Sequence, residues 1–258
     1  MQNNITSRRI AKIAAAAKSP GKILQFVRAA INHAGDSVPG TASDGFAVLP
    51  VVSLEQIVND HPSIHIEKFS YRDGNVSPAE LLAISAIVAH CKPEIVLEIG
   101  TFDGNTTLQL AANAPQNATI FTLDLPDGAN KAEKEIEEAD YRYVLSEEKR
   151  VRRYIGTTYE KQIRQLFGDS ATFDFGCVTK AGQPDLIFID GSHSYEYIKN
   201  DTERMLKFLA PNGVILWHDY HPYWTGVCRY LADLSNTMKI VNIEGTTLAY
   251  FAARPSAD

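Results

Sequence analysis

A short apolar run followed by two glycines, within residues 94–107, constrains the fold of this 258-residue chain more than any other segment. The run Ile95–Ile99 has the length and composition of a buried strand, and it carries one carboxylate, Glu98, near its end. Gly100 then ends the strand, and Gly104 opens a segment with a helical pattern. In doubly wound α/β folds, a strand, a glycine turn and a helix N-terminus together form the binding site for a nucleotide-like ligand.

The spacing of the glycines indicates which kind of ligand this turn can hold. Dinucleotide-binding folds use G-x-G-x-x-G, because three glycines let the backbone approach a pyrophosphate. Here the spacing is E-x-G-x-x-x-G, and Phe102 stands at the position of the middle glycine. The ring of Phe102 blocks a diphosphate and the carboxylate of Glu98 repels one, so the turn favours a cationic, phosphate-free ligand such as S-adenosylmethionine. The alternative is an ordinary strand–turn–helix that binds no ligand.

On this motif the chain resembles the class I S-adenosylmethionine-dependent methyltransferases, and its aromatic variant is most similar to the catechol and caffeoyl-CoA O-methyltransferase branch. The resemblance implies that S-adenosylmethionine binds at the turn. The residues expected to bind this cofactor are Glu98, Gly100, Thr101, Phe102, Gly104 and Asp124. Asp124 ends the run 119–124, roughly 20 residues past the turn, where a carboxylate accepts hydrogen bonds from ribose hydroxyls.

Acidic and imidazole side chains also follow two later apolar runs. Asp190 and His193 come shortly after Leu186–Ile189, and the run 213–218 ends at His218, directly before Asp219. In open α/β sheets, ligands bind outside the carboxyl ends of the strands. We therefore expect a single crevice lined by the acidic and imidazole side chains of Glu98, Asp124, Asp190, His193, His218 and Asp219.

The order of the predicted elements defines the fold class. A helix begins at the N-cap Ser77, and strand and helix patterns alternate after it. The predicted strands lie at residues 94–100, 118–124, 151–156, 185–190, 213–218, 238–243 and 247–252. A helix is predicted at 158–167 and a short extra strand at 171–178. The alternation predicts a Rossmann-like, doubly wound α/β sheet that is mostly parallel, and the last two strands predict an antiparallel hairpin at one edge.

Two segments stand outside this alternation. Residues 1–50 are predicted to be a helical arm and linker, and residues 51–258 the catalytic domain. The arm is basic, and it is expected to pack on the domain or on a second subunit, or to touch an anionic surface. An acidic insert at 130–148 is interpreted either as a solvated helix or as a lid over the cofactor.

Composition argues against several classes of partner. The net charge of −6 disfavours nucleic acid, and no apolar run approaches the ~20 residues of a membrane span. Cys91, Cys177 and Cys228 are odd in number and form no C-x-x-C, so we expect reduced, mostly buried thiols in a cytoplasmic protein. The N-terminus lacks a signal-peptide core. The expected partners are a small-molecule acceptor and, through the arm, a second copy in a homodimer.

Methyl transfer to a hydroxyl requires in-line alignment of the reacting atoms and removal of the hydroxyl proton. Either a divalent cation on carboxylate ligands lowers the pKa of the hydroxyl, or a histidine such as His193 takes the proton directly. From about 77 to 220 the chain is also similar to the family that holds macrolide-sugar O-methyltransferases and cephalosporin-hydroxylase-like proteins. This resemblance implies Mg²⁺ or another divalent cation, with Asp190 and Asp219 as ligands and His193 as the base.

His218 departs from that pattern, because the metal enzymes of the family carry a carboxylate at this place. Mg²⁺ prefers oxygen ligands. The expected ligand set of Asp190, His218 and Asp219 therefore leaves Mg²⁺, Mn²⁺, Fe²⁺ and no metal at all as alternatives. A core histidine bonded to the backbone is another reading of His218. The expected catalytic residues are His193 and Asp190.

The function expected from these patterns is S-adenosylmethionine-dependent O-methylation of a small polar acceptor. A hydroxyl on a sugar or a sugar-bearing natural product ranks first, and a catechol-like phenol ranks second. One alternative is a metal-dependent hydroxylase or oxidoreductase that uses Asp190, His218 and Asp219, since two carboxylates and a histidine can bind Fe²⁺. Another is an adenosylmethionine-binding module without turnover, because a fold does not fix an activity.

Overall fold

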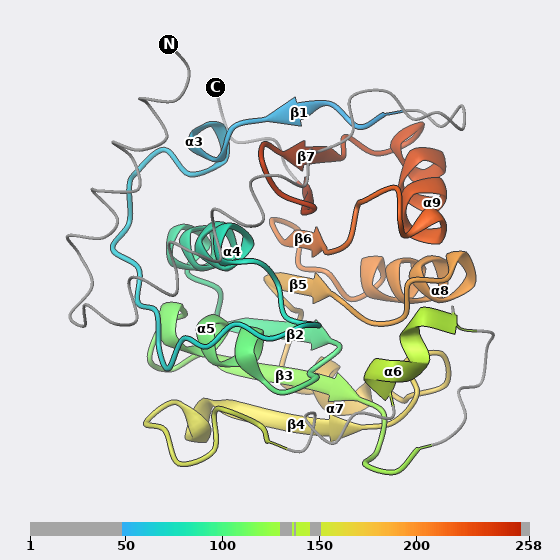
Figure 1. Ribbon diagram of the computed structural model, residues 1–258. Coiled ribbons are helices and arrows are strands. Elements are labelled where there is room, and N and C mark those ends of the chain that lie inside the picture. The colour runs from blue at the N-terminus through green and yellow to red at the C-terminus, as the bar shows by residue number, and fades with distance from the viewer. Residues whose placement is uncertain (1–47, 130–135, 137, 145–150, 254–258) are drawn as a thin grey trace.

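The computed structural model describes residues 48–129, 136, 138–144 and 151–253 (Figure 1). Within these residues, eight strands form one sheet in the order β1-β7-β8-β6-β5-β2-β3-β4. The strands are β1 (Val51–Val52), β2 (Ile95–Ile99), β3 (Thr119–Asp124), β4 (Ile163–Phe167), β5 (Leu186–Ile189), β6 (Val214–Trp217), β7 (Val241–Ile243) and β8 (Ala249–Ala252). The arm predicted at 1–50 lies almost entirely outside the described residues, so the division of the chain at residue 50 stays a prediction.

The direction of the strands agrees with the predicted fold class. β8 is antiparallel to both β6 and β7, and the other neighbouring strands are parallel. The prediction of a Rossmann-like, mostly parallel sheet with an antiparallel hairpin near one edge is therefore confirmed. β1 lies in a segment for which no strand was expected, and it extends the sheet beyond the hairpin by pairing in parallel with β7.

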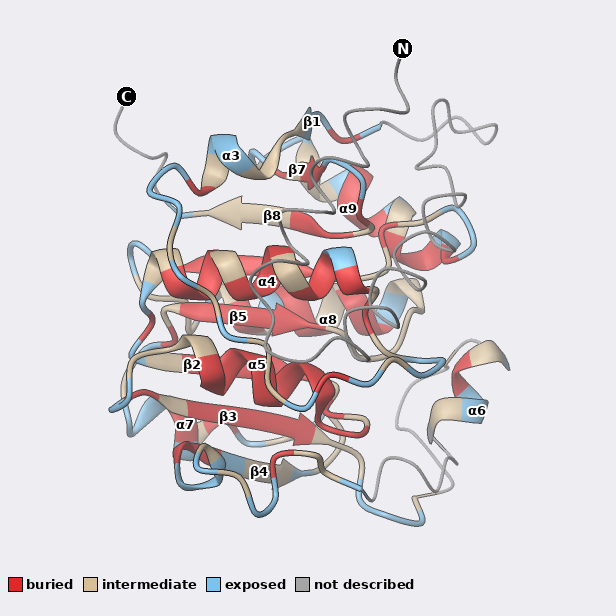
Figure 2. Cartoon of the chain, turned by 60° about the vertical axis from the view of Figure 1, so that its left-hand side comes forward, coloured by how far each residue is buried: buried red, intermediate tan, exposed pale blue. Residues whose placement is uncertain are grey.

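Helices cover both faces of the sheet (Figures 1 and 2). The helical segments are α3 (Leu54–Ile57), α4 (Pro78–Cys91), α5 (Asn105–Asn113), η1 (Glu138–Asp140), α6 (Tyr141–Val144), η3 (Glu160–Gln162), α7 (Gly176–Thr179), α8 (Tyr195–Leu206) and α9 (Thr225–Ser235). Successive strand residues point to opposite faces. Val96 accordingly belongs to the core that α4 and α5 share, and Leu97 to the core that α8 and α9 share. Burial on both faces explains why the central strands are apolar throughout.

Gly100 decides how the glycine turn meets the neighbouring strand. Its φ is +96°, and a Cβ built at this position would lie 1.9 Å from the carbonyl oxygen of Asp190. Only glycine tolerates both the positive φ and the close backbone. The turn after β2 and the end of β5 are therefore in direct backbone contact.

The prediction of the third strand is wrong. Residues 151–156 contain turns, β4 lies inside the segment predicted to be a helix, and residues 171–178 contain the start of α7 and no strand. Tyr159, Ile163 and Leu166 have the spacing of one helix face. Pairing with β3 overrides this local pattern, and β4 becomes a half-exposed edge strand.

Two expectations about the whole chain can be compared with the described residues. The three cysteines are free thiols, but Cys177 is exposed and the other two are half-buried, so the expectation of mostly buried thiols is wrong. Across residues 48–253, apart from the gaps given above, no helix is long and apolar enough to cross a bilayer.

Candidate active site

A cavity of about 900 Å³ opens at the carboxyl ends of the central strands. Most of the predicted site residues line it, namely Gly100, Thr101, Phe102, Asp124, Asp190, His193, His218 and Asp219. Glu98 and Gly104 do not line it. Asp190 and Asp219, which come from separate strands, thus share one cavity with the glycine turn.

The glycine turn is fixed to β3 by hydrogen bonds. The backbone N–H of Phe102 donates to Oδ2 of Asp124 over 2.9 Å, and Gly100 N–H donates to the carbonyl of Leu123. Phe102 has a φ of +47°, which is uncommon for a residue with a side chain. The Asp124 carboxylate therefore holds the turn in a strained shape while it also faces the cavity.

Glu98 lies beneath the turn, not in the cavity. Its side chain is fully buried, and Oε2 accepts hydrogen bonds from the hydroxyls of Thr107 and Thr122, each over 2.5 Å. Its Oε1 has no hydrogen-bond partner within the described residues. Burial raises the pKa of Glu98 to about 8, against the opposing effect of the two hydroxyl bonds. The expectation that Glu98 contacts the ligand is wrong, because a nearly neutral carboxyl that joins β2, β3 and α5 neither reaches nor repels one.

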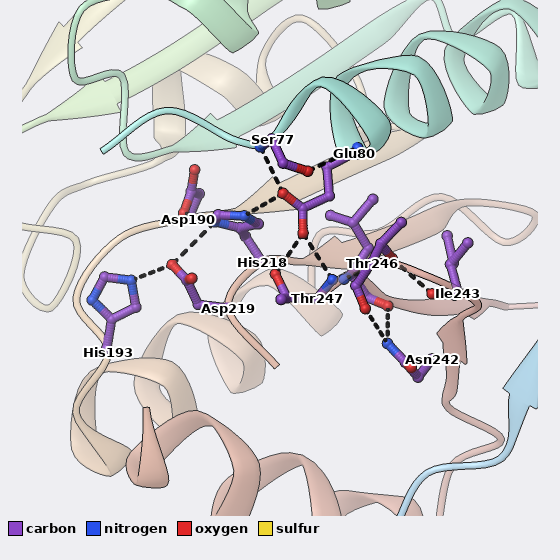
Figure 3. Close-up of polar contacts among 11 residues, drawn as sticks. Ser77, Glu80, Asp190, His193, His218, Asp219, Asn242, Ile243, Thr246 and Thr247 are labelled. Carbon is purple, nitrogen blue, oxygen red and sulfur yellow. Dashed lines mark hydrogen bonds and ion pairs between the residues drawn. The ribbon is translucent and has the colours of Figure 1, made fainter. Parts of the chain in front are cut away.

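His218 lies between three carboxylates (Figure 3). Its Nδ1 is 2.9 Å from Oδ1 of Asp190 and 3.0 Å from Oδ2 of Asp219, and its Nε2 is 3.2 Å from Oε2 of Glu80. Burial alone lowers the pKa of His218, but the charges of Asp219, Asp190 and Glu80 outweigh burial and raise the pKa well above its usual value. A ring that donates from both nitrogens is an imidazolium, so His218 carries positive charge at neutral pH.

His193 also bridges two carboxylates. Nδ1 is bonded to Oδ1 of Asp140, and Nε2 lies 2.6 Å from Oδ2 of Asp219. The ring stacks on Trp224, with centroids 3.7 Å apart and an angle of 15° between the planes. Burial opposes the positive charge, but Asp219 and Asp140 raise the pKa of His193 to about 10. The rings of His193 and His218 are therefore both held in their protonated forms.

Glu80 is a site residue that the sequence analysis missed. Ser77 is the N-cap of α4 as predicted, and Glu80 completes a capping box with it. The same carboxylate also accepts from the N–H and hydroxyl of Thr247, at 2.8 and 2.7 Å, and from His218. Burial would raise the pKa of Glu80, but these partners lower it to about 2. A local helix signal therefore concealed a long-range role.

Asp140 is the second missed residue, and it belongs to the acidic insert. Only 4% of its surface is exposed, and it lines the cavity. In the sequence it is one of many acidic residues between 130 and 148, and nothing local distinguishes it from the others. For Asp140 itself, the interpretation as part of a solvated helix face is wrong.

The far end of the cavity is formed by residues that follow β4, namely Gly168, Asp169 and Ser170. They follow a strand that the sequence analysis placed wrongly, so no sequence signal indicated them. Aromatic residues also line the cavity, namely Tyr71, Tyr220, Tyr223 and Trp224, and His221 joins them. Tyr195 does not line it, because its hydroxyl bonds to Asp233.

The expected metal ligand set of Asp190, His218 and Asp219 does not fit a Mg²⁺ ion. Both nitrogens of His218 are directed at carboxylates, and the carboxylate oxygens that face His218 accept its hydrogen bonds. His193 also brings a ligand atom within 4.8 Å of those of Asp190 and Asp219. Yet its Nε2 donates to Asp219 over 2.6 Å, whereas Mg²⁺ requires oxygen ligands in near-octahedral order. The cluster thus has two imidazolium rings where a cation was expected.

Comparison with known proteins follows the geometry. A family model described as a methyltransferase domain matches residues 97–220, which run from β2 to the residues after β6. The uncharacterised protein y4gI of Sinorhizobium fredii is 27% identical over 154 residues. The match covers 58% of this chain, and the chain spans 16% of the length of that relative.

Two solved structures share the fold. A candidate caffeoyl-CoA O-methyltransferase from Staphylococcus aureus is 15% identical, with a TM-score of 0.51, over 96% of this chain and 99% of its own. The adenosylhomocysteine-bound methyltransferase PaMTH1 of Podospora anserina is 16% identical, with a TM-score of 0.50, over 73% and 83% of the two chains. At such identities the likeness concerns the architecture, and the chemistry has to be argued from the site.

Proposed function

We propose that the chain is a class I methyltransferase and that it transfers the methyl group of S-adenosylmethionine to a hydroxyl oxygen of a small polar acceptor. The observation that carries this proposal is the shared cavity, in which the glycine turn meets Asp190, His193 and Asp219 at one edge of the sheet. The turn suits a sulfonium cofactor because it does not need to hold a diphosphate. Methyl transfer to a hydroxyl needs proton-accepting groups beside that hydroxyl.

The cofactor occupies the half of the cavity between β2 and β4. Asp124 accepts the backbone N–H bonds of Phe102 and Leu125, and a carboxylate has further lone pairs with which to accept ribose hydroxyls. Thr101, Phe102 and Gly100 form the wall beside it, and Gly168–Ser170 take the adenine end. The sulfonium then lies toward Asp190, where negative charge favours it.

The acceptor occupies the half of the cavity beside Trp224. Tyr223, with 65% of its surface exposed, and Trp224 present aromatic faces next to the charged cluster. Such a pairing of apolar faces and polar groups suits a sugar ring or a phenol. A hydroxyl on a sugar or natural product is our first choice of acceptor, and a catechol-like phenol the second.

His193, once its ring has lost the proton that it holds at neutral pH, is the general base of the reaction. The acceptor hydroxyl gives its proton to Nε2 while its oxygen bonds to the methyl carbon and the carbon–sulfur bond breaks, which leaves neutral adenosylhomocysteine. The protonated ring then donates from Nε2 to Asp219 and from Nδ1 to Asp140, as in the present structure. Asp190 and His218 hold Asp219 in place through the shared Nδ1 contact.

The proposal is tested by calorimetry and by turnover. Adenosylhomocysteine should bind with one-to-one stoichiometry, and NAD should not bind. Labelled S-adenosylmethionine should transfer its methyl group to members of a panel of sugars and phenols. Binding of NAD in place of adenosylhomocysteine would reject the cofactor assignment. Adenosylhomocysteine binding without turnover on any acceptor would favour a binding module.

The location and partners of the protein belong to the same proposal. Free thiols and a diffusible cofactor suit the cytoplasm, and a net charge of −6 suits a small-molecule acceptor better than nucleic acid. We propose a homodimer formed through the N-terminal arm. Light scattering of the full chain and of a variant truncated before residue 48 tests that assembly.

A further inference from the structure

The insert after β3 reaches the candidate base through Asp140. Oδ1 of Asp140 bonds to Nδ1 of His193, and Oδ2 accepts from the backbone N–H of His193 over 3.1 Å and from the hydroxyl of Ser192 over 2.8 Å. We propose that Asp140 is a positioning residue that holds His193 in the one orientation and tautomer in which Nε2 can accept the acceptor proton. The role of His193 as a base rests on the proposed function, whereas its contact with Asp140 does not.

His193 is enclosed by groups from four elements. Asp140 comes from η1, Asp219 follows β6 and Asp190 follows β5, with a ligand atom of each of the last two within 4.8 Å of the His193 ring nitrogen. Trp224, just before α9, stacks on the ring face. Asp140 contacts Nδ1, and Asp219 contacts Nε2.

The contact at Nδ1 fixes the tautomer of the ring. An ionised carboxylate only accepts hydrogen bonds, so Nδ1 must carry a hydrogen to bond with Asp140. Asp219 makes the same demand on Nε2 of the protonated ring. The neutral ring of the proposal keeps its hydrogen on Nδ1, because Asp140 is itself held by Ser192 and by the His193 backbone N–H, and this leaves the lone pair on Nε2. A carboxylate that orients a histidine in this way is a recurrent device of general-base catalysis.

The buried position of Asp140 supports a dedicated role. A carboxylate with 4% of its surface exposed is costly unless it is paired. Asp140 has three hydrogen-bond partners: the hydroxyl of Ser192, the backbone N–H of His193 and Nδ1 of the positive His193 ring. The insert also contacts the cofactor side of the cavity. The ring of Tyr143 meets Phe102 of the glycine turn edge to face, at 5.9 Å. The insert thus touches both the cofactor turn and the base.

The test compares Asp140→Asn with the matched control Glu138→Gln, which removes an exposed carboxylate two residues earlier in the same segment. The ring protons of His193 are followed by NMR as a function of pH, and His193→Asn identifies their signals among the seven histidines. Loss of one of two adjacent carboxylates should move the His193 midpoint to lower pH by about 1–3 pH units. Glu138→Gln should leave the midpoint unchanged.

Kinetics and binding complete the experiment. In Asp140→Asn, kcat on the alkaline plateau, where the base is neutral in both proteins, should fall at least about 10-fold. The pH at half-maximal rate should move down with the NMR midpoint, and adenosylhomocysteine affinity should stay within about 3-fold. Asp140→Glu, which keeps the charge, should restore the midpoint more than the rate. Retained affinity shows that the variant folds, and if Asp140→Asn does not fold, Asp140→Glu carries the same comparison.

The outcomes separate this proposal from the proposed function. An NMR midpoint that is the same in Asp140→Asn and the wild type overturns the positioning role, whether or not an acceptor is known. A shifted midpoint with an unchanged kcat also overturns it. Failure of adenosylhomocysteine to bind the wild type would reject the proposed function alone, because the NMR titration needs no cofactor.

Discussion

The buried carboxyl of Glu98 predicts an unusual dependence of stability on pH. Its pKa is about 8 in the folded protein, whereas the ordinary pKa of a glutamate, which applies to the unfolded chain, is 4.5. Between these two values the folded state holds a proton that the unfolded state releases. The free energy of unfolding therefore falls as the pH rises through this window, by 1.36 kcal/mol per pH unit. From pH 4.5 to pH 7 the loss due to Glu98 alone is about 3 kcal/mol.

Glu98→Gln removes the titration and keeps the shape of the side chain. The amide oxygen can still accept from Thr107 and Thr122, and the amide nitrogen takes the place of Oε1, which lacks a partner among the described residues. An unpaired amide costs roughly 1–3 kcal/mol at every pH. The difference in unfolding free energy between Gln and wild type should nevertheless shift in favour of Gln by about 3 kcal/mol from pH 4.5 to pH 7.

Urea unfolding at several pH values between 4.5 and 7.5 measures this difference, with the fluorescence of the buried Trp217 and Trp224 as the signal. Glu94→Gln, the same chemical change at an exposed position just before β2, is the matched control. A constant difference between Glu98→Gln and wild type across this range would refute the reasoning, because it would mean that Glu98 does not titrate between these pH values. Glu98→Gln should also keep adenosylhomocysteine affinity within about 3-fold, as expected for a residue outside the cavity.

Three further results are expected. Asp124→Ala should weaken adenosylhomocysteine binding about 10–100-fold in calorimetry, while Asp127→Ala, an exposed aspartate nearby, should not; equal affinities would reject Asp124 as the ribose contact. His193→Asn should lower kcat about 10²–10⁴-fold with little change in cofactor affinity. Because the pKa of His193 is about 10, the wild-type rate should rise with pH from 7 toward 10 as the ring loses its proton. A rate that falls with pH over this range would contradict the role of His193 as a base. Gly100→Ala should lower the free energy of unfolding by more than about 4 kcal/mol or prevent folding, because its Cβ meets the carbonyl oxygen of Asp190. Gly128→Ala, with φ +79° and open space around the Cβ, should lower it by about 1–2 kcal/mol. Similar losses would show that the backbone contact between Gly100 and Asp190 is not rigid.

Much of the sheet could be predicted because its central strands carry their own signal. β2, β5 and β6 are buried on both faces, so burial selects apolar runs that are legible in the sequence, with Glu98 as the one charged residue among them. β4 could not be predicted, because an edge strand is half exposed and its apolar residues also fit a helix. β1 has two residues and is defined by its partner β7 alone.

The candidate site divides in the same way. Asp190, His193, His218 and Asp219 follow legible strands, so the common cavity could be foreseen from topology. Glu80 reads as a capping residue and Asp140 as one acid of a charged run, since their partners lie 138 and 53 residues away in the chain. The position of the Glu98 side chain beneath the turn could not be predicted either, because a strand pattern does not show what lies on each face of the strand.

The amino-acid sequence by itself determined the strand–turn–helix at Gly100 and the positions of the central strands along the chain, because these depend on local periodicity. It also determined the sheet edge at which acids and imidazoles gather, because the carboxyl ends of parallel strands lie at the same edge. The tertiary structure alone decided which carboxylate meets which ring. Charge on a histidine, and hence its chemistry, depends on neighbours within a few ångströms. Two of those neighbours, Glu80 of α4 and Asp140 of the insert, are distant in the sequence, and only folding brings them to His218 and His193.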